Sequence, residues 1–150
     1  MFGSRNAGEI FALAFNGIIN QWIFGWSEYI GNYNTPSPSP DYNRHLFEIN
    51  KGVILMDNIE LFTYNFTSVP IVFQCSYSLY LFTSYGSGNT VPLLSTKIYK
   101  VIIYENEVKV RYLIPCYRKS DNVAGMYDGV NDIFYTNTST GSFIVGPDVN

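Results

Sequence analysis

Few residues of this chain have types and spacings suited to acid–base chemistry. Its one histidine is His45, in "NRHLFEIN", and its only Glu-x-Glu pair is Glu105 with Glu107. A glycoside hydrolase needs two carboxylates about 5 to 9.5 Å apart, which a strand would supply at i and i+2 or i+4. The glutamate pair stands at an expected hairpin turn, however, and His45 alternates with Phe47 and Ile49 like a residue packed on a sheet face. We therefore predict no catalytic residues and no enzyme activity.

The candidates for metal or cofactor binding are weak. The two cysteines, Cys75 and Cys116, lack the Cys-x-x-Cys spacing and the nearby histidine of zinc sites. We favour two buried free thiols, and a disulfide stays open if the two Cα atoms lie within about 7 Å. No glycine-rich phosphate motif occurs. Three acidic sequences could hold calcium but are equally ordinary turn chemistry, so we predict no metal and no cofactor. These sequences are Asp57–Asn58, Asp121–Asn122 and Asp128–Asn131–Asp132.

Carbohydrate binding has better support from residue types. Such sites commonly offer aromatic rings that stack on the apolar face of a sugar, with polar groups that reach its hydroxyls. Trp26, Tyr29 and Tyr33 lead into a loop stiffened by three prolines, and rigidity lowers the entropic cost of binding. Tyr85 and Asn89 lie in a Gly/Ser-rich segment. We predict these residues as a carbohydrate site, against the alternative that the aromatic residues only pack the core or cover a charge-poor surface.

Composition restricts the partners. Charged residues make up 14% of the chain, against about 25% in typical globular domains, and the net charge is −3. Nucleic acid and anionic membranes both require clustered Lys and Arg, so neither is expected as a partner. The apolar N-terminus lacks a basic region and is interrupted by Asn16, Asn20 and Gln21, which predicts neither a signal peptide nor a transmembrane segment. A charge-poor surface favours a virion or extracellular location.

The elements that would position these residues are short antiparallel strands. Alternation dominates the sequence, and no window has convincing helical spacing. "NG" at 16–17 predicts a two-residue hairpin turn, and the stretches 31–41 and 86–92 are expected loops. Pro115 is expected to end a strand, and the absence of a linker predicts one domain over 1–150, an all-β antiparallel sandwich. The expected strands are 10–15, 18–26, 42–50, two within 53–66 around Asp57–Asn58, 78–85, a hairpin within 97–114 that turns at 105–107, and three short strands within 125–145.

The last third of the chain resembles a known family. "KIYKVIIYENEVKVRYLIPCYR" runs into "GMYDGVNDIFYTNTSTGSFIVGPD", and this order is similar to the LamG, or concanavalin A-like, jelly-roll domains of phage tail and receptor-binding proteins of gut bacteria. Upstream, "YSLYLFTSYGSG" and "MFGSRNAG" extend the likeness to essentially the whole chain, whereas Tyr112 and Ser139 depart from it. The matching residues are Ile98, Tyr99, Ile103, Tyr104, Val110, Arg111, Ile114, Pro115, Cys116, Gly125, Tyr127, Asp128, Val130, Phe134, Tyr135, Asn137, Thr140, Gly141, Phe143 and Gly146.

The resemblance implies a concanavalin A-like jelly roll that acts as a non-enzymatic carbohydrate or surface-receptor binding module of a phage or prophage tail or virion. The partners that it implies are a bacterial surface glycan and other virion chains. Family members usually carry strands before the "FGSR" segment, so we expect an N-terminal edge strand that is either missing or supplied by a neighbouring chain, and hence an oligomer or larger assembly. Two alternatives stay open: a purely structural virion or cell-surface module without glycan binding, and a glycosidase fragment whose acidic pair lies elsewhere.

Overall fold

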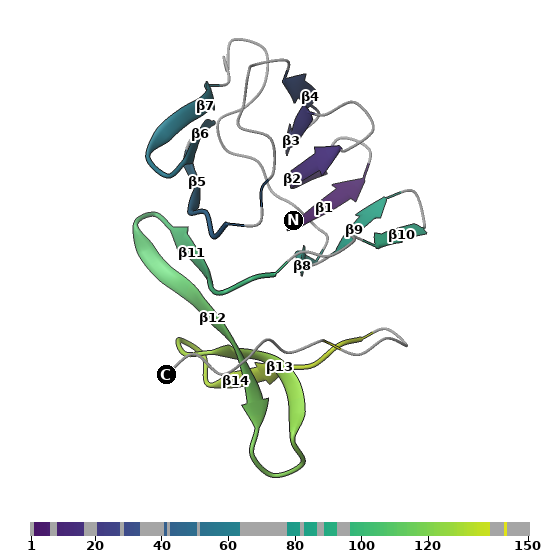
Figure 1. Ribbon diagram of the computed structural model, residues 1–150, viewed down its shortest axis with the longest axis vertical. Coiled ribbons are helices and arrows are strands. Elements are labelled where there is room, and N and C mark those ends of the chain that lie inside the picture. Colours follow the sequence, from purple (N-terminus) through teal and green to yellow (C-terminus); the bar gives the residue numbers. More distant parts are fainter. Residues whose placement is uncertain are drawn as a thin grey trace. The chain divides into compact units, whose positions relative to one another are not determined.

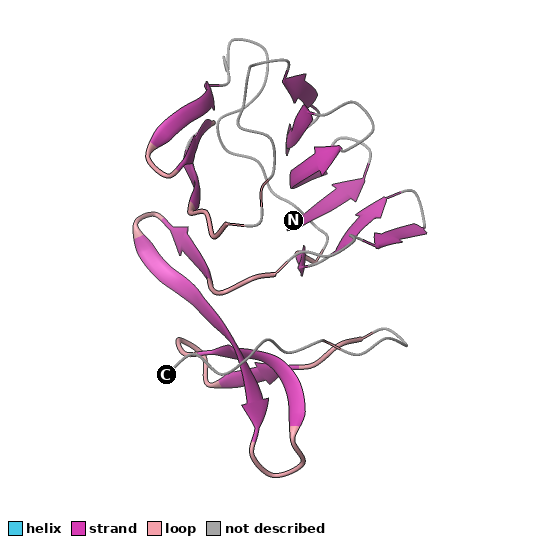
Figure 2. Ribbon diagram, viewed as in Figure 1, coloured by secondary structure: helices cyan, strands magenta, loops and turns pink. Residues whose placement is uncertain are grey.

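The computed structural model is all-β in the residues that it describes (Figure 1, Figure 2). Every regular element there is a strand and every strand pairing is antiparallel, which confirms the fold class predicted from alternation. The described part of the chain contains no helix with the length and hydropathy that a bilayer crossing requires. The described residues are 2–6, 9–16, 21–27, 29–33, 41, 43–50, 52–63, 78–81, 83–86, 89–92, 97–138 and 143.

The chain divides into two compact units, Met1–Thr96 and Lys97–Asn150. Among the described residues, the first unit contains sheets of five, three and two strands, and the second contains one sheet of four strands. Each unit therefore has its own hydrogen-bonded framework. The expectation that residues 1–150 form one domain stays a prediction.

The largest sheet of the first unit has five antiparallel strands. They are β1 (Phe2–Asn6), β2 (Glu9–Asn16), β3 (Gln21–Ser27), β4 (Tyr29–Tyr33) and β8 (Tyr80–Leu81), in the order β4-β3-β2-β1-β8. The β2–β3 hairpin follows the predicted alternation, since Leu13 pairs with Phe24 and both are buried. It closes at the pair Asn16–Gln21, so the predicted two-residue turn at 16–17 is wrong: Asn16 still belongs to the ladder.

A second sheet of this unit contains β5 (Phe47–Asn50), β6 (Val53–Met56) and β7 (Ile59–Thr63), in chain order. The predicted turn at Asp57–Asn58 is confirmed, because both residues have the positive φ that a type I′ hairpin turn requires, 52° and 65°. β5 is shorter than the predicted strand 42–50. Residues 43–46 lie outside the strand, and hydrogen bonds to two aspartate side chains hold that segment instead.

The core of the first unit lies between these two sheets. Phe24 of β3 packs with Ile54, Met56 and Leu61 of the three-stranded sheet, and all four are at most 9% exposed. Burying an apolar side chain of this kind contributes about 1.5–3 kcal/mol, so the cluster holds the sheets face to face as a β-sandwich. Further partly buried residues pack against this cluster: Trp22, Trp26, Phe47, Ile49 and Phe62. The jelly-roll connectivity stays a prediction.

Two segments expected as loops contain strands. β9 (Thr83–Gly86) and β10 (Asn89–Pro92) form a two-stranded sheet, so the loop prediction for 86–92 is wrong over β10. β4 likewise takes in residues 31–33 of the proline-containing stretch, whose prolines lie outside the described residues. Gly, Ser and Asn lower the intrinsic strand preference of both segments. Pairing with a neighbouring strand outweighs that preference, because it satisfies the backbone N–H and C=O groups.

The second unit is a four-stranded antiparallel meander. Its strands are β11 (Val101–Glu105), β12 (Val108–Arg118), β13 (Val123–Asp128) and β14 (Ile133–Tyr135), in chain order. The predicted hairpin turn is confirmed at Asn106 and Glu107, which have φ of 48° and 67°. Two of the three short strands predicted within 125–145 are also confirmed, since β13 and β14 pair as neighbouring antiparallel strands. Of the third strand predicted within 141–145, Phe143 alone is described.

β12 differs from the predicted strand in two ways. Its pairing with β11 skips Val110 between Lys109 and Arg111, which makes a β-bulge. The bulge interrupts the regular alternation between Val108 and Val110. Pro115 does not end the strand, which runs three residues past it. β11 does not reach Pro115, so β12 has one neighbour there among the described strands, and a missing N–H is tolerated.

Two glycines of this unit lie in different surroundings. Gly129 lies in the β13–β14 turn and donates its N–H to the carbonyl of Tyr112 at 2.9 Å. Gly125 lies inside β13, where a Cβ atom would collide with the ring of Phe134 and the carbonyl oxygen of Tyr135. Glycine at this position therefore allows an aromatic ring to lie across the strand.

Candidate functional site

The carboxylate of Asp128, at the end of β13, is fully buried. It accepts hydrogen bonds from the backbone N–H groups of Tyr112 and Val130, at 3.1 and 3.0 Å, and from the side-chain amide of Asn131 at 2.7 Å. Burial would raise the pKa of Asp128, but these bonds and the Arg111 guanidinium, 3.6 Å away, lower it overall. Two donors of the β13–β14 turn and one donor of β12 therefore occupy this carboxylate, which makes it a group that stabilises the turn and joins it to β12.

A second of the three acidic sequences considered for calcium, Asp121–Asn122, is also engaged by protein groups. Asp121 accepts hydrogen bonds from the guanidinium of Arg118, with Nε at 3.0 and 3.1 Å from its two oxygens. Within the described residues, no group of three or more His, Cys, Asp or Glu side chains is placed to hold a metal ion. Cys116 carries a free thiol and is half-buried, while Cys75 lies outside the described residues.

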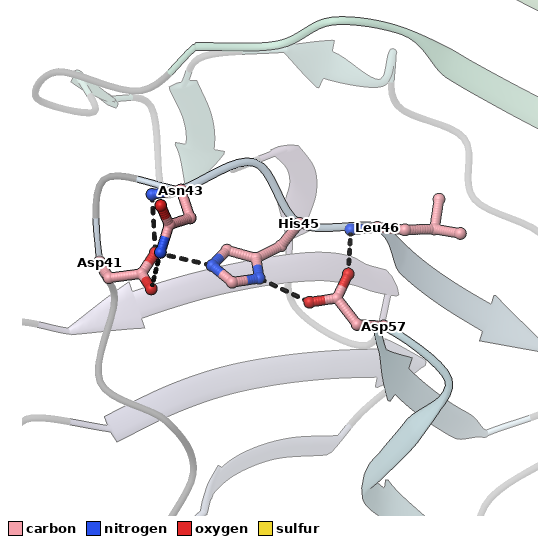
Figure 3. A network of polar contacts seen from close by, with 5 residues as sticks. All are labelled: Asp41, Asn43, His45, Leu46 and Asp57. Carbon is pink, nitrogen blue, oxygen red and sulfur yellow. Dashed lines mark hydrogen bonds and ion pairs between the residues drawn. The ribbon is translucent and has the colours of Figure 1, made fainter.

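A polar network surrounds His45, just before β5 (Figure 3). Its Nε2 lies 2.7 Å from Asp41 Oδ1 and its Nδ1 lies 2.7 Å from Asp57 Oδ2, so the ring bridges two carboxylates. Asp41 also accepts hydrogen bonds from the backbone N–H and side-chain amide of Asn43, and Asp57 accepts one from the N–H of Leu46 at 2.9 Å. The prediction that His45 packs on a strand face is wrong, because the residue precedes the strand and two acids hold its ring.

The chemistry open to this network follows from the use of both ring nitrogens. The carboxylates of Asp57 and then Asp41, as hydrogen-bond acceptors for the ring, raise the pKa of His45 above its usual 6.5. The pKa of each carboxyl group is lowered, mainly by its hydrogen bond with His45. A general base needs a ring nitrogen that can reach the proton of a nucleophile. Here both nitrogens face acids, so His45 connects two carboxylates and is not arranged as a base.

A shallow groove lies on the face of β5–β6 opposite the core. It has a volume of about 260 Å³ and is lined by Glu48, Asn50, Val53 and Leu55. The register pairs Glu48 with Leu55 and Asn50 with Val53, so the four side chains stand side by side on one face. Sequence reasoning missed this site. Alternation along β5 could have indicated an outward face for Glu48 and Asn50, but the β6 residues that complete the groove depend on the register.

The structure places the predicted carbohydrate-binding residues on four strands, β3, β4, β9 and β10. Trp26 lies on β3 with its ring against the core: its centroid is 5.7 Å from that of Phe11 and 6.1 Å from that of Phe24. The β3–β4 register brings Trp26 opposite Tyr29 and Trp22 opposite Tyr33. Tyr85 lies in β9 and Asn89 in β10, a separate two-stranded sheet. The side chains of Tyr29, Tyr33, Tyr85 and Asn89 lie outside the described residues.

Fold and groove together define the class of this protein. It is an all-β, antiparallel sandwich protein with a shallow surface groove of mixed polar and apolar lining. Comparison of the chain with family models, with curated proteins and with solved structures gave no match.

Proposed function

We propose that this chain is a non-enzymatic carbohydrate-binding module of a phage or prophage tail or virion, which contacts glycans on a bacterial surface. The groove on β5–β6 is the observation that supports binding. Val53 and Leu55 offer an aliphatic surface for the C–H face of a sugar ring, and Glu48 and Asn50 offer hydrogen-bonding groups for its hydroxyls. The phage setting rests on the sequence resemblance to LamG-like domains.

The volume of the groove limits the size of the ligand that it can bind. Its volume of about 260 Å³ is below the ~300 Å³ at which sites begin to enclose drug-sized ligands, which suits a single sugar ring. A ring of about a dozen heavy atoms, at ~0.3 kcal/mol per atom, binds with a Kd in the millimolar range. Such weak binding becomes useful when many copies act together, as on a virion.

The charge of the groove favours one class of sugar. Glu48 is the one charged residue among the four that line it. Its carboxylate accepts hydrogen bonds from hydroxyl or ammonium groups and repels other carboxylates. Neutral and amino sugars are therefore the proposed ligands, and acidic sugars are disfavoured. A single carboxylate also falls short of the pair that glycoside hydrolysis requires, which supports binding without catalysis.

The residues predicted from sequence stay part of this proposal as a second contact set: Trp26, Tyr29, Tyr33, Tyr85 and Asn89. Replacement of Trp26 would not separate sugar binding from folding, because its ring also packs against Phe11 and the core. Tyr85→Ala is the better probe of this second set. Loss of sugar binding in Tyr85→Ala with an unchanged far-UV spectrum would support a role for the β9–β10 sheet.

Filling the groove should abolish sugar binding. Leu55→Arg places a long cationic side chain beside Glu48, and we expect at least a tenfold loss of affinity for neutral and amino sugars. Titration followed by NMR chemical shifts detects the millimolar binding expected of the unmodified chain. Ile59→Arg is the matched control: it adds the same charge to the same sheet, at a residue that is 69% exposed and outside the groove.

Three results would contradict this proposal. If no neutral or amino sugar shifts the Glu48, Asn50, Val53 and Leu55 signals, and a multivalent glycan array is also negative, the chain is a structural module. If Leu55→Arg and Ile59→Arg bind alike, the groove is not the site. Release of reducing sugar from bacterial capsule would show a glycosidase instead.

A further inference from the structure

The His45 network joins two parts of the chain at the beginning of a short edge strand. β5 is four residues long, and within the described part of the chain it pairs on one side, with β6, in its three-stranded sheet. Just before it, two hydrogen bonds join Leu46 to Asp57, both at 2.9 Å: the Asp57 N–H donates to the Leu46 carbonyl, and the Leu46 N–H donates to the side-chain oxygen Oδ1 of Asp57. His45 adds a bridge from Asp57 to Asp41, which directly follows the proline-rich stretch.

We propose that Asp41, His45 and Asp57 form a proton-dependent clasp, which fastens the start of β5 to the β6–β7 turn and opens when the imidazolium loses its proton. The reason is the number of N–H donors. An imidazolium has two and can donate to both carboxylates, which lie 2.7 Å from its two ring nitrogens. A neutral imidazole has one, and its other nitrogen then points a lone pair at a carboxylate. Deprotonation therefore breaks one of the two contacts.

The groups that face His45 set the direction of this dependence. Asp41, from the segment before β5, and Asp57, from the β6–β7 turn, are the charged groups that shift its pKa, and both raise it, while partial burial opposes them. A raised pKa in the folded state means that the clasp contributes its full stability below pH 6.5 and loses it as the pH rises through the folded-state pKa. In acid the clasp persists until the carboxyl groups, whose pKa values are lowered, become protonated.

The clasp is testable because His45 is the one histidine of the chain, so its ring signals in an NMR pH titration need no assignment by mutation. We expect a pKa above 6.5 in the unmodified chain, and a lower value in both Asp41→Asn and Asp57→Asn. Asp121→Asn is the matched control. It removes a carboxylate that pairs with Arg118 in the other unit, and it should leave the titration of His45 unchanged.

A second measurement follows the opening itself. Protection of the Leu46 and Asp57 amides against hydrogen exchange, corrected for the intrinsic pH dependence of exchange, should fall as the pH passes the pKa of His45. In His45→Gln this protection should show no such step. The proposal is overturned by a His45 pKa at or below 6.5, by a pKa that neither Asn variant lowers, or by amide protection that stays constant through the titration.

Discussion

Asp128→Ala should lower the free energy of unfolding by roughly 3 kcal/mol, because Asp128 is a buried charged acceptor and a hydrogen bond to a charged group contributes about 1.5–3 kcal/mol. The substitution removes the acceptor for three donors, the N–H groups of Tyr112 and Val130 and the amide of Asn131. Arg111, whose side chain is 43% exposed, keeps access to water. Urea unfolding followed by far-UV circular dichroism measures the loss. Amide exchange at Tyr112 and Val130 assigns it to the β13–β14 turn.

Asp128→Asn separates the hydrogen bonds from the charge. Its amide oxygen keeps one acceptor of similar shape, so we expect a smaller loss than in the alanine variant. Because the pKa of Asp128 is lowered in the folded state, its contribution to stability is present above pH 3.8 and disappears as the pH falls through the folded-state pKa. The Asn variant should lack this acid-side dependence. Equal stability of Asp128→Ala and the unmodified chain would contradict the role assigned to this carboxylate.

Phe24→Ala should lower the free energy of unfolding of the first unit by about 3–5 kcal/mol. Phe24 is 1% exposed and packs between the two sheets against Ile54, Met56 and Leu61, so its removal leaves a cavity between the layers. The chain has two tryptophans, and both lie on β3 beside Phe24. Tryptophan fluorescence during urea unfolding therefore reports on the unit that carries the substitution.

The control for this prediction is Phe24→Leu, which keeps an apolar side chain and leaves a smaller cavity. We expect a loss well below that of the alanine variant. Asp128→Ala lies in the other unit and should leave the tryptophan transition less affected than Phe24→Ala does. A loss under about 1 kcal/mol for Phe24→Ala would mean that the β3 face does not form the core of the sandwich.

Alternation in the sequence was sufficient to predict the strands where the polar and apolar residues are well separated. The β6–β7 hairpin was predicted with its turn at Asp57–Asn58, and the β11–β12 hairpin with its turn near Asn106. Predictions that relied on single residues were less successful. Pro115 was expected to end its strand, but β12 continues past it. A strand tolerates proline where no neighbouring strand needs its N–H, and whether β11 lies beside Pro115 cannot be read from a single residue. The strand within 86–92 depends on its pairing with β9.

The candidate sites depended still more on tertiary structure. His45 was singled out from the sequence, but its partners stand 4 and 12 residues away, and no local pattern connects them. The groove was not predicted at all, because Glu48 and Asn50 meet Leu55 and Val53 only in one register of β5 and β6. From the sequence, Trp26 was predicted to stack its ring on a sugar, whereas the structure places that ring against the core.

The sequence by itself determined the fold class, most of the strands and the faces that carry apolar residues. These follow from side-chain period and turn chemistry, which act over a few neighbouring residues. The tertiary structure decided the register, the bulge at Val110, the two acids around His45 and the four residues of the groove. Each of these requires residues from different segments to meet, and contact between segments is set by strand pairing and core packing rather than by local preference.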